Sequence, residues 1–175
     1  MSAWTRIEHK ELTGTQATIE FTSIPSTYTD LVLVCSLRSN RNLTDDGVLL
    51  TFNNLTTNRT FRDLYGLGSG TPASSNSTVM RLASCPAATS TASTFGNTML
   101  YIPNYAGNTN KSSSVDGVME NNATFSVQTI IANLWSSTAA ISSIEIIAEI
   151  GSFVQYSSAT LWGVTKGSSG GVTVS

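Results

Sequence analysis

Charge is what this sequence has least of. Only 11% of its 175 residues are Asp, Glu, Lys or Arg, whereas soluble domains average about 25%. Nine basic and eleven acidic side chains give a formal net charge of −2, and the basic residues are scattered along the chain. Nucleic-acid binding depends on clustered Lys and Arg side chains that displace counterions from phosphates. We therefore expect no nucleic-acid partner.

Long hydrophobic runs and an apolar leader are also missing. No segment approaches the roughly 18 apolar residues of a transmembrane helix, so we expect no membrane partner. The first 14 residues include Arg6, Glu8, His9 and Lys10, and they lack the apolar core of a signal peptide. Export through an ordinary signal sequence is therefore not expected.

Residues that carry catalysis are scarce. There is one histidine, His9, in a polar N-terminal stretch, and a Ser/His/Asp or Cys/His catalytic site would have to use it. His and Cys are too few for a zinc site. Asp45, Asp46 and Gly47 lack the spacing of a calcium-binding loop. We therefore predict no enzymatic activity, no cofactor and no metal.

Small uncharged polar residues take the place of charge. Ser, Thr, Asn and Gly make up 77 of the 175 residues. Thr favours strands, whereas Ser, Asn and Gly favour turns, so the composition predicts many strands and many turns. The six Asn-x-Ser/Thr sequences follow from this composition, which supplies roughly four by chance.

Alternating apolar residues locate the expected strands. The strongest run is 30–38, in which Leu31, Leu33, Cys35 and Leu37 share one face. Cys35 is therefore predicted to be a buried thiol. The sequence does not decide whether Cys35 and Cys85 form a disulfide. The other candidate strands are 15–21, 48–53, 58–65, 79–83, 98–102, 112–120, 125–133, 141–149 and 154–164.

This pattern predicts an all-β chain, a single β-sandwich of jelly-roll type with about nine or ten antiparallel strands. Residues 1–14 are expected to form an N-terminal arm, residues 15–166 the sandwich and residues 167–175 a flexible tail. Residues 66–77 read as a loop. One helical turn is allowed at 133–138.

Side chains outside the predicted core are the candidates for contact. Trp4 and His9 in the arm, with Val172 and Val174 in the tail, are candidate contacts to a partner subunit. Tyr101 and Tyr105 are candidate glycan contacts, because aromatic faces stack on sugar rings.

Seven segments in order resemble a known family. They are 21–33 (FTSIPSTYTDLVL), 50–53 (LTFN), 101–105 (YIPNY), 114–123 (SVDGVMENNA), 134–141 (LWSSTAAI), 152–157 (SFVQYS) and 161–164 (LWGV). Together they resemble short virion structural proteins of tailed bacteriophages of aquatic bacteria, described as structural or tail-fibre-like. The resemblance implies synthesis in a bacterial host cytoplasm and a place on the virion surface.

Three functions follow from these observations. The first is a capsid decoration (cement) protein, expected to be a homo-oligomer, with a trimer favoured, that binds over junctions of the major capsid protein. The second is a tail-fibre or receptor-binding protein that contacts host surface glycans. A hydrolase of surface polysaccharide ranks last, because no pair of carboxylates stands out from ordinary outward-facing residues.

Overall fold

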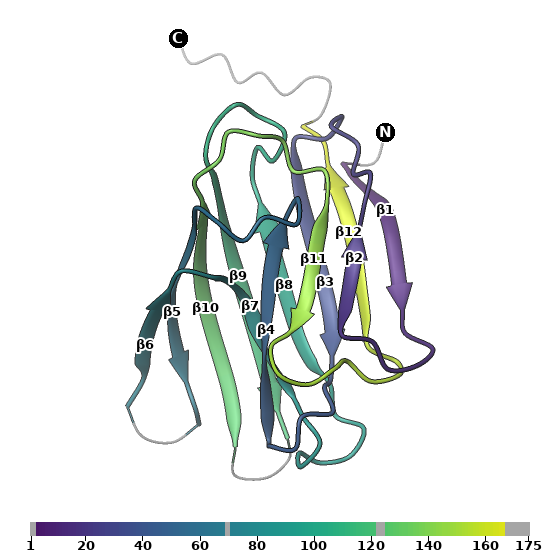
Figure 1. Cartoon of the computed structure of the whole chain (residues 1–175), viewed down its shortest axis with the longest axis vertical. Helices are drawn as coiled ribbons and strands as arrows, with labels where there is room; N and C mark the ends of the chain where they lie inside the picture. Colours follow the sequence, from purple (N-terminus) through teal and green to yellow (C-terminus); the bar gives the residue numbers. More distant parts are fainter. Residues whose placement is uncertain (1–2, 69–70, 122–124, 167–175) are drawn as a thin grey trace.

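In a computed structural model the chain forms two antiparallel sheets packed face to face, as in a sandwich (Figure 1). The structure describes residues 3–68, 71–121 and 125–166. These ranges hold 12 strands and no helix, so none of them contains a helix that could cross a membrane. The all-β prediction is confirmed. The strands are β1 (Trp4–Glu11), β2 (Thr18–Phe21), β3 (Asp30–Leu37), β4 (Asp45–Phe52), β5 (Arg59–Gly66), β6 (Ala73–Ser77), β7 (Met80–Pro86), β8 (Gly96–Ile102), β9 (Lys111–Glu120), β10 (Ser126–Trp135), β11 (Ile144–Ala148) and β12 (Ser158–Val164).

The core lies between the sheets because successive side chains of a strand point to opposite faces. In β9 and β10 burial alternates residue by residue, so that Val115 and Ile131 are buried while Asp116 and Ile130 are exposed. Aromatic side chains connect the two layers: the ring centroids of Phe52 on β4 and Trp135 on β10 are 5.9 Å apart, edge to face.

Eight of the strands pair in a nested order. In the larger sheet β1 pairs with β12 and β3 pairs with β8; in the smaller sheet β2 pairs with β11 and β4 pairs with β7. The first strand of the eight therefore pairs with the last, the second with the seventh, and so on inward. This order is compatible with the predicted jelly roll.

The other four strands widen the larger sheet. Its order is β1-β12-β3-β8-β9-β10-β5-β6, against β2-β11-β4-β7 in the smaller sheet. Figure 1 shows β5 and β6 beyond the strands of the smaller sheet, at the far side of β10. The β5–β6 hairpin is therefore an overhang of the larger sheet.

Three of the local predictions are wrong. Residues 4–11 are not part of an arm: they form β1, which pairs with β12 and carries one bulge between Arg6 and Glu8, so the sandwich begins at Trp4. The predicted loop 66–77 contains β6, and Asn133–Trp135 end β10 instead of starting a helical turn. β1 and β6 are edge strands with mostly exposed side chains, so neither shows an apolar alternation. The predicted tail, 167–175, lies outside the described residues.

A glycine fixes the packing of one edge of the sandwich. The ring of Tyr28 lies over Gly163 in β12, with its nearest atom 2.3 Å from the position that a Cβ would take. Only glycine leaves room for this ring. Tyr28 in turn packs against the hydrophobic core.

Candidate interaction surface

The outer face of the larger sheet carries a row of apolar side chains. Strand register places Val34 opposite Met99, Met99 opposite Asp116, Asp116 opposite Ile130, and Ile130 opposite Leu64. Residues directly opposite in a sheet share a face. These five residues, from β3, β8, β9, β10 and β5, are called the outer stripe.

The outer stripe is solvent-exposed. Ile130 is 66% exposed, Leu64 54% and Met99 48%, and the described residues around Asp116 line three shallow depressions. Val118, Tyr101 and Leu134 add exposed apolar surface next to it: each occupies an outward-facing position of β9, β8 or β10. Contiguous exposed apolar surface of this kind is typical of a contact site for another molecule.

Asp116 is the only charged member of the outer stripe. Its carboxylate lies between Met99 and Ile130 in the row. A partner that covers the stripe has to supply a hydrogen-bond donor there, because a carboxylate buried without one is costly. The stripe therefore favours a partner with apolar side chains around a polar or basic group.

Two of the predicted partner contacts lie at the β1 end of the same face. His9 is opposite Thr160, and its Nδ1 shares a 2.8 Å hydrogen bond with Thr160 Oγ1. Trp4 is exposed, and its ring packs edge to face on Trp162 with centroids 6.5 Å apart. Both residues are held by the sheet and not by a free arm. The other two predicted contacts, Val172 and Val174, lie outside the described residues.

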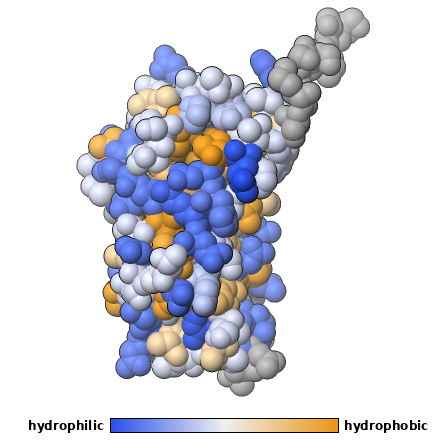
Figure 2. Space-filling model, turned by 90° about the vertical axis from the view of Figure 1, so that its right-hand side faces the viewer, coloured by the Kyte–Doolittle hydropathy of each residue, from blue (hydrophilic) through white to orange (hydrophobic). Residues whose placement is uncertain are grey.

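The β1 edge itself is polar. Glu8 and Lys10 form a 3.2 Å ion pair, and Figure 2 shows this side of the molecule mostly covered by hydrophilic side chains, with small hydrophobic patches between them. Charged side chains and a bulge hinder strand pairing at an edge. The sheet edge at β1 is therefore a poor site for adding a strand.

The two tyrosines predicted to contact glycans differ. Tyr101 is exposed on the outer face and donates a 2.9 Å hydrogen bond to Asp30 Oδ2; this bond is the main reason that its pKa is raised. Tyr105 is completely buried, its hydroxyl donates to the Pro25 carbonyl, and burial raises its pKa. Tyr105 is thus a core residue, and its prediction as a glycan contact is wrong.

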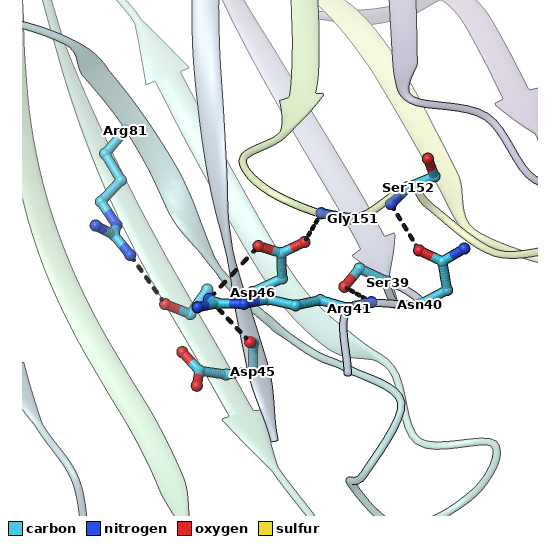
Figure 3. Close-up of polar contacts among 9 residues, drawn as sticks. Ser39, Asn40, Arg41, Asp45, Asp46, Arg81, Gly151 and Ser152 are labelled. Carbon is cyan, nitrogen blue, oxygen red and sulfur yellow. Dashed lines mark hydrogen bonds and ion pairs between the residues drawn. The ribbon is translucent and has the colours of Figure 1, made fainter. Parts of the chain in front are cut away.

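The Asp45-Asp46-Gly47 segment has a structural role (Figure 3). Asp46 is fully buried, and its Oδ2 accepts a 2.9 Å hydrogen bond from the Gly151 amide. The Arg41 guanidinium lies 3.8 Å from Oδ1. These contacts join the loop after β3 to the loop after β11. Among the described residues no group of three or more His, Cys, Asp or Glu side chains could hold a metal ion.

The sequence contained a signal for the outer stripe that the prediction of sites did not use. In β10, Val127 and Ile131 point into the core, while Ile130 and Leu134 are apolar residues on the opposite, outward face. When apolar residues occupy both the odd and the even positions of a strand, its outward face is apolar as well as its inward face. The pairing of distant strands, which makes these positions one surface, has no signal in a single strand.

Three comparisons with known proteins were negative. No protein-family model, no curated protein and no solved structure matches the chain.

Proposed function

We propose that the chain is a non-enzymatic structural subunit of a tailed-bacteriophage particle, and that it acts as a capsid decoration protein over junctions of the major capsid protein. The observation that carries this proposal is the outer stripe, an exposed apolar row across five strands of one sheet. The resemblance of the sequence to virion structural proteins supports a structural role on the virion surface, and it fits a place on the capsid and a place on the tail equally.

A rigid sheet is a suitable surface for such a contact. Full burial of a side chain such as Ile or Leu contributes about 1.5–3 kcal/mol, and a preformed strand loses little conformational entropy on binding. A protein that buries this surface across a junction between two capsid subunits raises the free energy needed to separate them.

The negative charge of Asp116 in the outer stripe affects which oligomers can form through this surface. A two-fold contact centred on the stripe would place two copies of Asp116 against each other, because such a contact uses the same patch on both subunits. Like charges in a buried contact are unfavourable. A two-fold dimer through the stripe is therefore disfavoured, which is consistent with the proposed homotrimer. Trp4 and His9 at the β1 end are its candidate subunit contacts, and such contacts leave the stripe free for the capsid.

Copy number in the particle tests the role. Densitometry of purified virions should give hundreds of copies per particle for a decoration protein. A handful of copies would exclude the decoration role and favour the tail.

A matched pair of substitutions tests the surface. Ile130→Asp places a charge in the outer stripe, whereas Ile150→Asp places one in the β11–β12 connection at an isoleucine of equal exposure, 67% against 66%. We expect Ile130→Asp to lower incorporation into particles at least about tenfold, which corresponds to about 1.4 kcal/mol, and Ile150→Asp to leave it unchanged. Equal incorporation of the two variants would contradict the assignment of the surface.

The second candidate is a tail-fibre or receptor-binding protein that contacts host glycans. Tyr101 favours it, because its ring is exposed beside a shallow depression that Met99, Ser114 and Ile130 also line. Retention of the isolated protein on a glycan array, lost in Tyr101→Ala, would support this role. Retention that survives the substitution would exclude Tyr101 as the contact.

A further inference from the structure

A cavity of about 200 Å³ opens under the β5–β6 overhang. Its floor is the inner face of β5, β6 and β10, which the smaller sheet leaves uncovered beyond β7. Pockets for drug-sized ligands measure about 300–1,000 Å³. This cavity therefore suits a group of the size of one ring.

One wall holds a buried hydrogen-bond acceptor. Asp63 on β5 is 8% exposed, and its Oδ1 accepts hydrogen bonds of 2.7 Å from both the amide and the hydroxyl of Ser75 on β6. Its Oδ2 has no hydrogen bond from the described residues. Because Asp63 lines the cavity and Ser75 fixes its carboxylate through Oδ1, Oδ2 is free to accept a hydrogen bond from a ligand.

The edge strand of the smaller sheet supplies a positioned donor. Arg81 on β7 exchanges two 2.9 Å hydrogen bonds between its backbone and the side chain of Asn133, and its Nη2 donates to Ser84 Oγ at 3.3 Å. In Figure 3 the Asp45 carboxylate points away from Asp46, toward the side on which Arg81 lies. Asp45 and Arg81 both line the cavity.

Apolar side chains also line the cavity. Tyr65, Phe125 and Val127 contribute aromatic and aliphatic surface to the cavity. An aromatic side chain there can pack against an apolar face of a ligand.

The charged groups of the lining are two carboxylates, Asp45 and Asp63, and one guanidinium, Arg81. They disfavour an anion, and together they offer a neutral ligand both acceptors and a donor. A neutral ligand with donors and acceptors along one edge can hydrogen-bond to the carboxylates and the guanidinium, and C–H groups on one of its faces can pack against the apolar side chains. Saccharide rings have this chemistry, since vicinal hydroxyls donate to a carboxylate and accept from a guanidinium.

We propose that this cavity binds one ring of a neutral saccharide, with Asp63 and Asp45 as acceptors and Arg81 as donor. The site is separate from Tyr101 and from the outer stripe, and the inference does not depend on whether the chain belongs to the capsid or the tail. Copy number in virions tests the structural role, whereas binding to the isolated protein tests this site.

Chemical-shift perturbation of the labelled full chain by a panel of neutral methyl pyranosides tests the proposal. We expect at least one pyranoside to shift the amides of Asp63, Ser75 and Thr129 with a Kd on the order of 1 mM. Asp63→Asn keeps an oxygen that accepts from Ser75 but removes the negative charge at the second oxygen. It should weaken binding at least about tenfold, because a charge-assisted hydrogen bond to the ligand is lost.

Matched variants keep the test decisive. Glu11→Gln removes one carboxylate from the exposed β1 edge and should leave binding unchanged. Asp45→Asn should also weaken it, which gives a second variant if Asp63→Asn does not fold. The proposal is overturned if no pyranoside shifts the cavity amides, if both cavity variants bind like the parent, or if Tyr101→Ala abolishes binding. Preferential binding of methylguanidinium or acetate in the cavity would also overturn it.

Discussion

At the residue scale, the side chain of one arginine is hydrogen-bonded to four positions of a single loop. Arg38 follows β3 and is only 8% exposed. Its two terminal nitrogens donate to four backbone carbonyls of the β7–β8 connection, at 2.8–3.1 Å. The acceptors are the carbonyls of Ala87, Ser90, Thr91 and Thr94. The described contacts include no carboxylate partner for this guanidinium, so carbonyl dipoles compensate its buried charge.

Replacing this side chain should therefore be costly. Arg38→Met keeps much of the volume but leaves four carbonyls without their donor, and we expect a loss of about 3 kcal/mol in the free energy of unfolding. Urea denaturation measures the change. Arg62→Met, at an exposed position of β5, is the control and should stay within about 0.5 kcal/mol. Equal effects of the two substitutions would show that the loop does not depend on Arg38.

A buried thiol should make stability depend on pH. Burial raises the pKa of Cys85 from 9.0 to about 12, and the negative charges of Asp46 and Asp45 add to this, whereas hydrogen bonding to Ser39 lowers it. The folded protein thus keeps its proton where the unfolded chain has lost it. A raised pKa gives stability that is fully present below about pH 9 and is lost as the pH rises toward 12.

We therefore expect the free energy of unfolding to fall between about pH 9 and pH 12. Cys85→Ala creates a small cavity and lowers stability at neutral pH, but it should reduce the slope in this alkaline window. Urea denaturation of both proteins at several pH values measures the two slopes. Parallel slopes would show that the thiol does not carry the effect.

At the scale of elements, the sequence identifies strands that bury one face and misses strands that do not. The strands at 30–37 and 126–135 have apolar residues at most of their inward-facing positions, and the predicted strands 30–38 and 125–133 agree with them within a few residues. β1 and β6 have exposed side chains and charge or Ser and Asn in place of apolar residues. Their strand conformation comes from pairing with β12 and β5, which local sequence does not encode.

Register explains why the surface could not be predicted. Met99 and Asp116 are 17 positions apart in the chain, and Asp116 and Ile130 are 14 apart. They become neighbours only because β8, β9 and β10 pair in one register. The two tyrosines of the segment 101–105 (YIPNY) also could not be told apart from the sequence. Tyr101 occupies an outward-facing strand position, whereas Tyr105 follows the strand end and turns into the core toward Pro25.

At the scale of the whole molecule, stability should not be uniform. β3 lies inside the larger sheet between β12 and β8, and most of its side chains are buried. β6 is the outermost strand, pairs only with β5, and all five of its side chains are exposed. Segments with few buried contacts open locally at a lower free-energy cost than the core does.

Hydrogen exchange should resolve this gradient. We expect amides of β3 to exchange only through global unfolding, with a protection free energy of about 5–15 kcal/mol, and those of β6 to exchange several kcal/mol more easily. Since Ser75 on β6 holds Asp63 at the cavity wall, a saccharide bound in the cavity should slow exchange of the Ser75 amide and leave β3 unchanged. Protection of β6 equal to that of β3 without any ligand would contradict the lower local stability of the overhang.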